Sequence, residues 1–225
     1  MSTIKLTKND GFSWFKQNEI YVKGFIYSDD KTCLTGPALC NYFKNINNSV
    51  DLSNKLSSAN GQFSVIIKYK DNIFAAIDRL RSFPLFYAIL NNNPIISDDP
   101  DEIIKITNLN KINSIREEEF LATGFVTGDR TLLDNLYQIQ AGALLSVQNS
   151  KINQTFYHTN ETSYISKHSY TELYDQLNRI LENASKRLTG SLQGRALLLS
   201  LSGGYDSRLI ASMLKNQKYE NVICF

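Results

Sequence analysis

The chain has 225 residues, 42% of them hydrophobic, and a formal net charge of +2 at pH 7. This length allows one large or two small domains with a buried core, and the small charge gives no electrostatic footprint for nucleic acid. The first residues lack the basic and apolar stretches of a signal peptide, and no apolar run approaches a membrane span. The three cysteines, Cys33, Cys40 and Cys224, have no paired spacing, which favours free thiols in a cytoplasmic protein over disulfides or a zinc site.

Strand patterns dominate the first 160 residues. Residues 62–69 are β-branched and aromatic, as in a strand, and residues 73–78 follow a short turn as its return strand. Residues 19–27 form another predicted strand, broken at Gly24 where a glycine permits close approach of a second backbone. Further strands are expected at 85–90, 95–97, 142–147 and 152–157, and short helices at 37–43, from 99 onward, and at 117–122. Many strands and few helices predict an α+β domain over roughly residues 1–160.

The sequence pattern changes from strands to a helix after a polar connector at residues 158–167. Ser169 and Glu172 fit a capping box, which predicts the start of a helix. Apolar residues then recur at helical spacing, and Gly190 stands where a C-cap is expected. The apolar set is Leu173, Leu177, Ile180, Leu181, Ala184 and Leu188.

A strand, a glycine loop, a helix and a second strand are predicted next. Residues 195–201 read as a buried strand, residues 208–215 as a helix and residues 221–225 as a second strand. With the preceding helix, this order over residues 169–225 is the opening of a doubly wound parallel α/β domain. Two strands and two helices do not complete such a sheet, so we expect an open sheet edge.

The loop itself, Ser202-Gly203-Gly204-Tyr205-Asp206-Ser207, has the composition of an anion site. Its backbone N–H groups and the helix dipole attract a phosphate, and two adjacent glycines let that phosphate approach the main chain. Asp206 would add a carboxylate beside the phosphate, as a bridging magnesium ion requires. The Gly-Lys-Ser/Thr of the commoner phosphate loop is absent. The alternative is a glycine turn that binds nothing.

The pattern Ser-Gly-Gly-x-Asp-Ser resembles the pyrophosphate loop of ATP pyrophosphatases, which split ATP into AMP and pyrophosphate while adenylating a substrate. The chain as a whole resembles the N-terminal portion of asparagine synthetase-type proteins, in which a glutaminase domain precedes a synthetase domain. The collinear matches are Gly24-Phe25-Ile26-Tyr27, Gly61-Gln62-Phe63-Ser64, Asp78-Arg79 with Pro84-Leu85-Phe86-Tyr87, Thr131-Leu132-Leu133 through Ala141-Gly142, Phe156-Tyr157, and the loop. For Asp78, Arg79 and Pro84 a structural role, a paired charge and a turn, is the expected one.

This resemblance implies an N-terminal-nucleophile-type αββα sandwich over residues 1–160, followed by the truncated start of an ATP-binding domain. It implies an ATP- and Mg²⁺-dependent ligase that adenylates a small carboxylate such as aspartate and forms an amide with ammonia, releasing AMP and pyrophosphate. The residues that it assigns to ATP and pyrophosphate are Leu201, Ser202, Gly203, Gly204, Asp206 and Ser207, with Asp206 as the metal ligand.

The departures from the family concern the glutaminase site. Ser2 stands where the family has a nucleophilic cysteine, and Thr3 stands where it has glycine. The family's oxyanion-donating asparagine corresponds to Lys23, and its substrate-clamping arginine and aspartate have no clear counterparts. We therefore expect no glutaminase activity and a ligase that uses free ammonia, while Ser2 as an N-terminal nucleophile remains the alternative.

Two other functions stay open. One alternative to the asparagine synthetase-like ligase is a truncated remnant without catalysis that acts as a binding module. The other is a ligase with a different acceptor, similar to β-lactam synthetases, which also lack the glutaminase cysteine. No nucleic-acid or membrane partner is expected, and a homodimer is left open.

Overall fold

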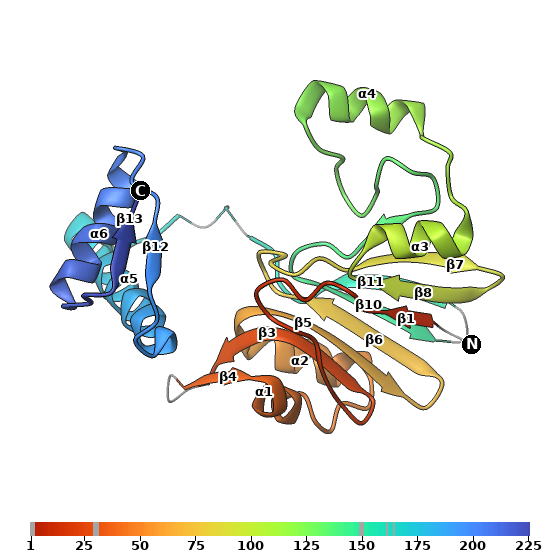
Figure 1. Ribbon diagram of the computed structural model, residues 1–225, viewed down its shortest axis with the longest axis horizontal. Helices are drawn as coiled ribbons and strands as arrows, with labels where there is room; N and C mark the ends of the chain where they lie inside the picture. Colours follow the sequence, from red (N-terminus) through yellow and green to blue (C-terminus); the bar gives the residue numbers. More distant parts are fainter. Residues whose placement is uncertain (1–2, 29–31, 149–150, 161, 164) are drawn as a thin grey trace. The chain divides into compact units, whose positions relative to one another are not determined.

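The computed structural model describes residues 3–28, 32–148, 151–160, 162–163 and 165–225. The chain divides into two compact units, Met1–Asn160 and Glu161–Phe225 (Figure 1).

The first unit contains a seven-stranded antiparallel sheet in the order β11-β10-β6-β5-β3-β2, with β4 also paired to β3. The predicted hairpin forms its centre, because Lys70 adopts a left-handed φ of 53° and turns β5 back into β6. The strands are β2 Phe15–Gln17, β3 Ile20–Tyr27, β4 Cys33–Thr35, β5 Asn60–Tyr69, β6 Asn72–Ile77, β10 Ala143–Gln148 and β11 Lys151–Phe156.

A second sheet of the first unit has four strands in the order β1-β8-β7-β9. These are β1 Thr3–Lys5, β7 Phe86–Leu90, β8 Asn93–Ser97 and β9 Tyr137–Gln138. β1 runs parallel to β8, with Thr3 opposite Ile95, whereas the other pairs are antiparallel. The resemblance described above also implies two antiparallel sheets, and this pair departs from that expectation, because the chain between the two strands is long enough to return β8 in the same direction as β1.

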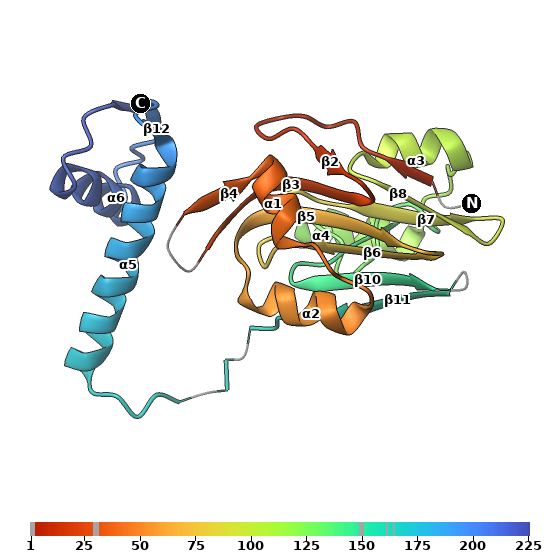
Figure 2. The ribbon, with the colours of Figure 1, turned by 90° about the horizontal axis from the view of Figure 1, so that it is seen from below.

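Three apolar clusters show the layers of the first unit (Figure 2). Ile66 and Ala75 of the large sheet pack against Tyr87 and Ile96 of the small sheet. The other face of the large sheet is covered by α1 Gly36–Tyr42 and α2 Ser49–Ser58, and the other face of the small sheet by α3 Pro100–Thr107. The layer order is therefore α-β-β-α, as expected for this part of the chain.

Helix α4, Ser114–Thr123, differs from the other helices of the first unit because none of its residues is buried. It projects away from the two sheets in Figure 1 and ends at Gly124, whose φ is 83°. The helix is therefore defined by its caps and by local hydrogen bonds more than by tertiary packing.

The second unit contains α5 Tyr170–Leu192, β12 Leu197–Leu199, α6 Tyr205–Asn216 and β13 Val222–Cys224. β12 and β13 form a parallel pair separate from the sheets of the first unit, and α6 connects them. The Ser169–Glu172 capping box is present. Gly190 is not the C-cap: the helix continues to Leu192, because Gln193 is the residue that takes the left-handed conformation, with φ 49°.

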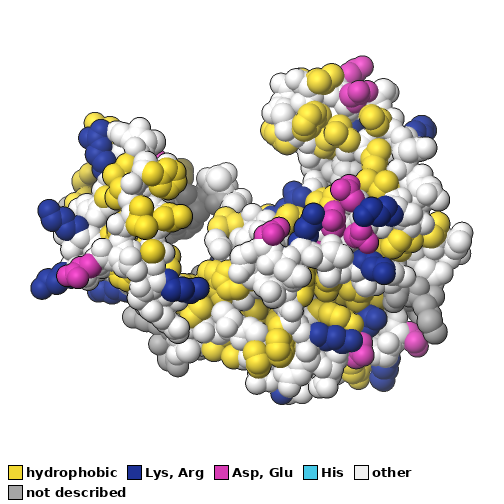
Figure 3. Space-filling view, viewed as in Figure 1, with side chains coloured by type: hydrophobic (Ala, Val, Ile, Leu, Met, Phe, Trp, Pro, Cys, Tyr) yellow, Lys and Arg dark blue, Asp and Glu magenta, His cyan; other side chains and the backbone are white. Residues whose placement is uncertain are grey.

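The two-stranded sheet of the second unit carries exposed apolar side chains. Leu198 and Ile223 are 67% and 53% exposed, and Figure 3 shows apolar side chains gathered over β12 and β13. Leu199 faces the opposite way and is buried. Within the described part of the chain, no helix has the length and hydrophobicity needed to cross a membrane.

Candidate functional site

The predicted anion loop lies between the end of β12 and the start of α6. Gly203 has a φ of 78°, a left-handed conformation that glycine adopts without strain. Gly204 is the N-cap of α6 in an extended conformation, and no side chain caps the helix. The N–H groups of the first turn therefore have no side-chain acceptor, and they carry the positive end of the helix dipole.

Asp206 and Ser207 lie in the first turn of α6, although the sequence predicted the helix only from residue 208. The Asp206 side chain is exposed, and it forms no ion pair with any residue that the structure describes. Ser207 is buried, and its hydroxyl donates to the Gly204 carbonyl at 3.3 Å. The Asp206 carboxylate is thus available to a cation, whereas the Ser207 hydroxyl closes the first turn.

Arg208, in the first turn of α6, had no predicted role at the site. Its Nε donates to the Gly203 carbonyl oxygen at 3.1 Å, and its Nη2 donates to the same oxygen. The guanidinium carbon lies 5.5 Å from the centre of the Tyr205 ring. Arg208 therefore fixes the glycine loop and brings a permanent positive charge beside its N–H groups. Its position five residues after Gly203, on the first turn of a predicted helix, was the only sequence signal for this contact.

Leu201 continues the pairing of β12 with β13 beyond the strand itself. Its N–H donates to the Phe225 carbonyl at 2.9 Å, and the Phe225 N–H donates to the Leu199 carbonyl at 3.1 Å. Leu201 and Phe225 are nevertheless exposed. Leu201, which the resemblance assigns to ATP, thus lies on an open apolar surface.

Two pockets of the structure lie away from this loop. One, of about 260 Å³, is lined in the first unit by residues that include Phe63, Arg79 and His158. The other, of about 250 Å³, lies between α5 and α6 and includes Lys186 and Met213. No group of three or more His, Cys, Asp or Glu side chains suited to a metal occurs among the described residues. A magnesium ion at Asp206 would therefore share its coordination with phosphate oxygens, as this ion commonly does.

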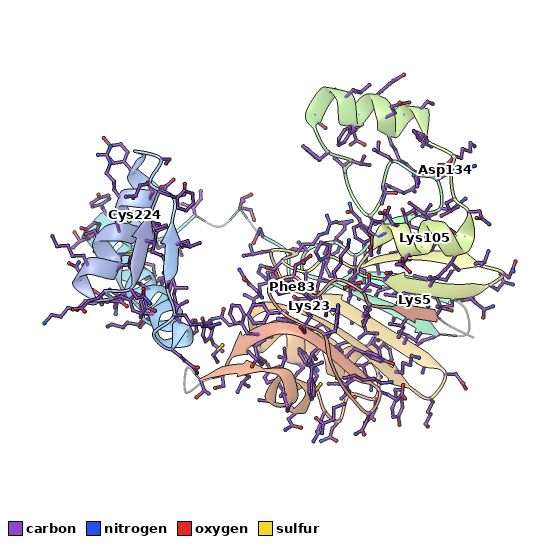
Figure 4. All side chains as sticks on the ribbon, viewed as in Figure 1. Lys5, Lys23, Phe83, Lys105, Asp134 and Cys224 are labelled. Atoms are coloured by element: carbon purple, nitrogen blue, oxygen red, sulfur yellow. The ribbon has the colours of Figure 1, made fainter. Side chains whose placement is uncertain are left out.

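Ser2 and Lys23 are the residues that the sequence resemblance placed at a glutaminase site. Ser2 lies outside the described residues. Lys23 on β3 is only 5% exposed, and its ammonium donates to the Lys8 carbonyl at 2.7 Å. The same ammonium lies 5.4 Å from the centre of the Phe83 ring, and the two residues are labelled side by side in Figure 4. Burial lowers the pKa of Lys23. The Lys23 ammonium is thus already bonded to the main chain of the same protein.

The segment of residues 7–14 is fastened over this position by Asp98. The Asp98 carboxylate accepts hydrogen bonds from the Thr7 N–H at 2.8 Å, the Lys8 N–H at 3.0 Å and the Trp14 indole N–H at 2.6 Å. Phe12 of the segment packs against Phe25 and Phe83, with ring centres 5.6 and 5.8 Å apart. Aromatic rings therefore occupy the space beside Lys23.

Gly24 and Asp78 have the structural roles that the sequence predicted, with one correction. A Cβ atom on Gly24 would lie 2.1 Å from the Gln62 carbonyl oxygen, so the close approach of two strands is confirmed. Asp78 is buried and accepts from the N–H groups of Phe63, Leu80 and Ser82. The expected charge pair is wrong, because these partners are backbone groups.

Arg79 and Pro84 were also predicted to have structural roles. The Arg79 guanidinium donates to the Ser57 carbonyl at 2.8 Å and does not pair with Asp78. Pro84 lies in the connection between β6 and β7, after the turn at residues 79–80 and the bend at residues 82–83, and is not itself part of a turn.

No protein-family model matches the chain, and no curated protein matches it. Among solved structures, the chain is similar to a glutamine phosphoribosylpyrophosphate amidotransferase from B. subtilis in complex with ADP and GMP, with 11% identity and a TM-score of 0.41. It is also similar to a structure described as the allosteric regulatory enzyme of purine biosynthesis, with 11% identity and a TM-score of 0.42. Both matches cover 65% of this chain and 31% of the other chain, so the chain spans about a third of their length. Neither is an asparagine synthetase, and that part of the resemblance stays a prediction.

Proposed function

We propose that the loop Ser202–Ser207 binds the pyrophosphate portion of ATP with magnesium. The chain is then the amidotransferase-like and nucleotide-binding portion of an asparagine synthetase-like ligase. In such a ligase, bound ATP and magnesium supply the activation of a small carboxylate, aspartate by resemblance, and ammonia is the amide donor.

The observation that carries this proposal is the uncapped start of α6. Gly203 and Gly204 leave the N–H groups of the first turn without a side-chain acceptor, and Asp206 lies exposed in that same turn. A Cβ on Gly203 would meet no atom within 4 Å, so the loop is open on that side. Donors for an anion and one carboxylate for a cation are thus adjacent.

Each residue would then have a distinct task. The N–H groups of the first turn would hold the charge that develops on the departing pyrophosphate, and the Arg208 guanidinium would keep the loop carbonyl turned away from it. Asp206 would hold magnesium together with phosphate oxygens. Ser207 would contribute its main-chain N–H, since its hydroxyl is used by Gly204. Leu201 would offer apolar surface to the nucleoside.

The same proposal assigns no glutaminase chemistry to the first unit. A nucleophile of this type needs donors for a developing oxyanion. The Lys23 ammonium is already bonded to Lys8, and Phe12 fills the adjoining space. We therefore expect no release of glutamate from glutamine. Steady glutamate release that Ser2→Ala abolishes would contradict this expectation.

A calorimetric titration with pyrophosphate, with and without magnesium, tests the site. We expect binding that magnesium strengthens, and weaker binding of AMP because the nucleoside side is open. Asp206→Asn should abolish the magnesium effect, and Gly204→Val should weaken binding about tenfold or more by blocking close approach, which corresponds to at least about 1.4 kcal/mol. Asp175→Asn, an exposed aspartate on α5, is the matched control and should bind as the wild type does. If neither loop variant changes binding, the loop is only a turn.

A different observation favours the alternative that the chain is a binding module without catalysis. Many apolar side chains of the second unit are exposed, Leu198 and Ile223 among them, as on a surface that binds another protein. A binding module would show no magnesium-dependent affinity for pyrophosphate, so the same titration separates the two functions.

A further inference from the structure

Helix α5 carries a continuous apolar stripe on its exposed side. The residues of this α5 stripe are Tyr170, Leu173, Leu177, Ile180, Ala184 and Leu188. From Leu173 to Ala184 they are spaced four, three and four residues apart, the spacing that lines up side chains in paired helices. Leu177 and Ile180, at its centre, are 53% and 64% exposed. A helix face of this kind normally packs against another helix.

The second unit covers a different side of α5. Thr189 donates to the Gln217 side chain at 2.7 Å, which fixes the C-terminal half of α5 beside the end of α6. The first half of α5 extends beyond α6 and the two strands in Figure 2. The α5 stripe therefore has no helix of its own unit against it.

The charges of α5 favour a second copy of the same helix as the partner. Residues 170–178 contain two acidic residues and no basic one, whereas residues 179–192 contain three basic residues and one acidic one. Two copies that pack antiparallel bring the acidic half of each beside the basic half of the other and oppose their helix dipoles. A parallel pair would bring like charges together. The helix is thus complementary to itself under a two-fold axis.

We propose that the α5 stripe is a homodimer interface in which two α5 helices pack antiparallel about a two-fold axis between Leu177 and Ile180. In this arrangement Leu177 of one copy contacts Ile180 of the other, and Leu173 contacts Ala184. The interface uses a face of the chain remote in sequence from the Ser202–Ser207 loop and does not depend on nucleotide binding.

Sedimentation of the full chain tests the proposal. We expect the wild type to be a dimer at micromolar concentration. The double variant Leu177→Glu/Ile180→Glu brings four carboxylates to the centre of the interface and should raise the dimer dissociation constant by roughly 100-fold or more, where each tenfold step is about 1.4 kcal/mol. Leu209→Glu/Ile210→Glu, on comparably exposed positions of α6, is the matched control and should remain dimeric. Far-UV circular dichroism should show the helix content of both variants unchanged.

Cysteine cross-linking tests the direction of the pair. In a Cys33→Ser/Cys224→Ser background, a mixture of Leu173→Cys and Ala184→Cys chains should form mixed disulfide dimers, and neither chain alone should cross-link efficiently. A monomeric wild type at about 200 μM, a dimer unaffected by Leu177→Glu/Ile180→Glu, or cross-linking of Leu173→Cys with itself would each overturn the proposal. The first result would mean that a different segment or protein covers the stripe.

Discussion

The two units of this chain differ in how much of themselves they bury. Among the described residues, the buried apolar side chains of the second unit are Leu199 and Leu214, whereas the first unit has three buried clusters. The first unit also buries polar groups, and it satisfies them: Asp78 and Asp98 each accept three hydrogen bonds. The first unit therefore has an extensive buried core, whereas the helices and strands of the second unit leave most of their apolar side chains exposed.

This difference indicates where binding is to be expected. In the first unit, the ammonium of Lys23 is buried and bonded to the Lys8 carbonyl, and Phe12 and Phe83 pack beside it. These groups are therefore not free to contact a ligand. In the second unit, the uncapped start of α6, the exposed Asp206 and the α5 stripe are all unengaged within the described structure. We therefore assign stability to the first unit and recognition to the second.

The largest effect is expected from Asp78→Ala. The substitution leaves three N–H groups without their carboxylate, two of them in the 78–82 turn, and each lost partner costs about 1–3 kcal/mol. We expect the free energy of unfolding of the first unit to fall by at least about 3 kcal/mol. Urea unfolding followed by the fluorescence of Trp14, the single tryptophan, reports on that unit alone.

Asp71→Ala is the control for this prediction, because Asp71 lies exposed in the turn between β5 and β6. It should change stability by no more than about 0.5 kcal/mol. Equal effects of the two substitutions would mean that the Asp78 network does not hold the first unit together.

A pair of glycine substitutions sharpens the contrast between the units. At Gly24, with φ 93°, alanine would bring its Cβ onto the Gln62 carbonyl and the Phe83 ring, so Gly24→Ala should destabilise the first unit by about 2–4 kcal/mol. Gly190 lies inside α5 with no atom within 4 Å of a built Cβ. Gly190→Ala should stabilise that helix by about 0.5–1 kcal/mol.

Trp14 fluorescence measures the destabilisation by Gly24→Ala. The backbone hydrogen exchange of residues 170–192 in the intact chain measures the stabilisation by Gly190→Ala. Slower exchange is expected in Gly190→Ala. Faster exchange there, or an unchanged unfolding midpoint in Gly24→Ala, would contradict the packing described for the corresponding unit.

The smallest effect concerns the pH dependence of the first unit. Burial lowers the pKa of Lys23 below its ordinary value of 10.5, so between these two values the unfolded chain binds more protons than the folded chain. Stability due to Lys23 must then rise with pH across that window. The stability of the wild type relative to Lys23→Met should therefore increase as the pH rises toward 10.5 in urea unfolding experiments. A relative decrease would show that the pKa of Lys23 is raised.

Local patterns predicted the elements whose signals are local. The β5–β6 hairpin, the capping box of Ser169 and Glu172, and the order of strand, loop and helix around Gly203 were all readable from neighbouring residues. Helix α2 was missed, since its buried side is only Leu52 and Leu56 in a polar stretch. Its N-cap, Asn48, accepts from the Asp51 N–H and was a usable signal.

Contacts between distant residues could not be predicted in this way. The parallel pairing of Thr3 with Ile95 and the hydrogen bonds from Thr7 and Trp14 to Asp98 join segments more than 80 residues apart. The loop residues of the candidate site were predicted as a group because they are contiguous. The role of Arg208 required the loop conformation, since only that conformation brings the Gly203 carbonyl to its guanidinium.

The central claim is that the N–H groups at the start of α6 bind pyrophosphate. Nuclear magnetic resonance of the ¹⁵N-labelled chain measures this directly, because each N–H gives its own signal. On addition of pyrophosphate with magnesium, we expect the signals of residues 203–207 to shift most, with smaller shifts when magnesium is absent and none in Gly204→Val. Shifts confined to other residues, or equal shifts in the wild type and Gly204→Val, would contradict the account.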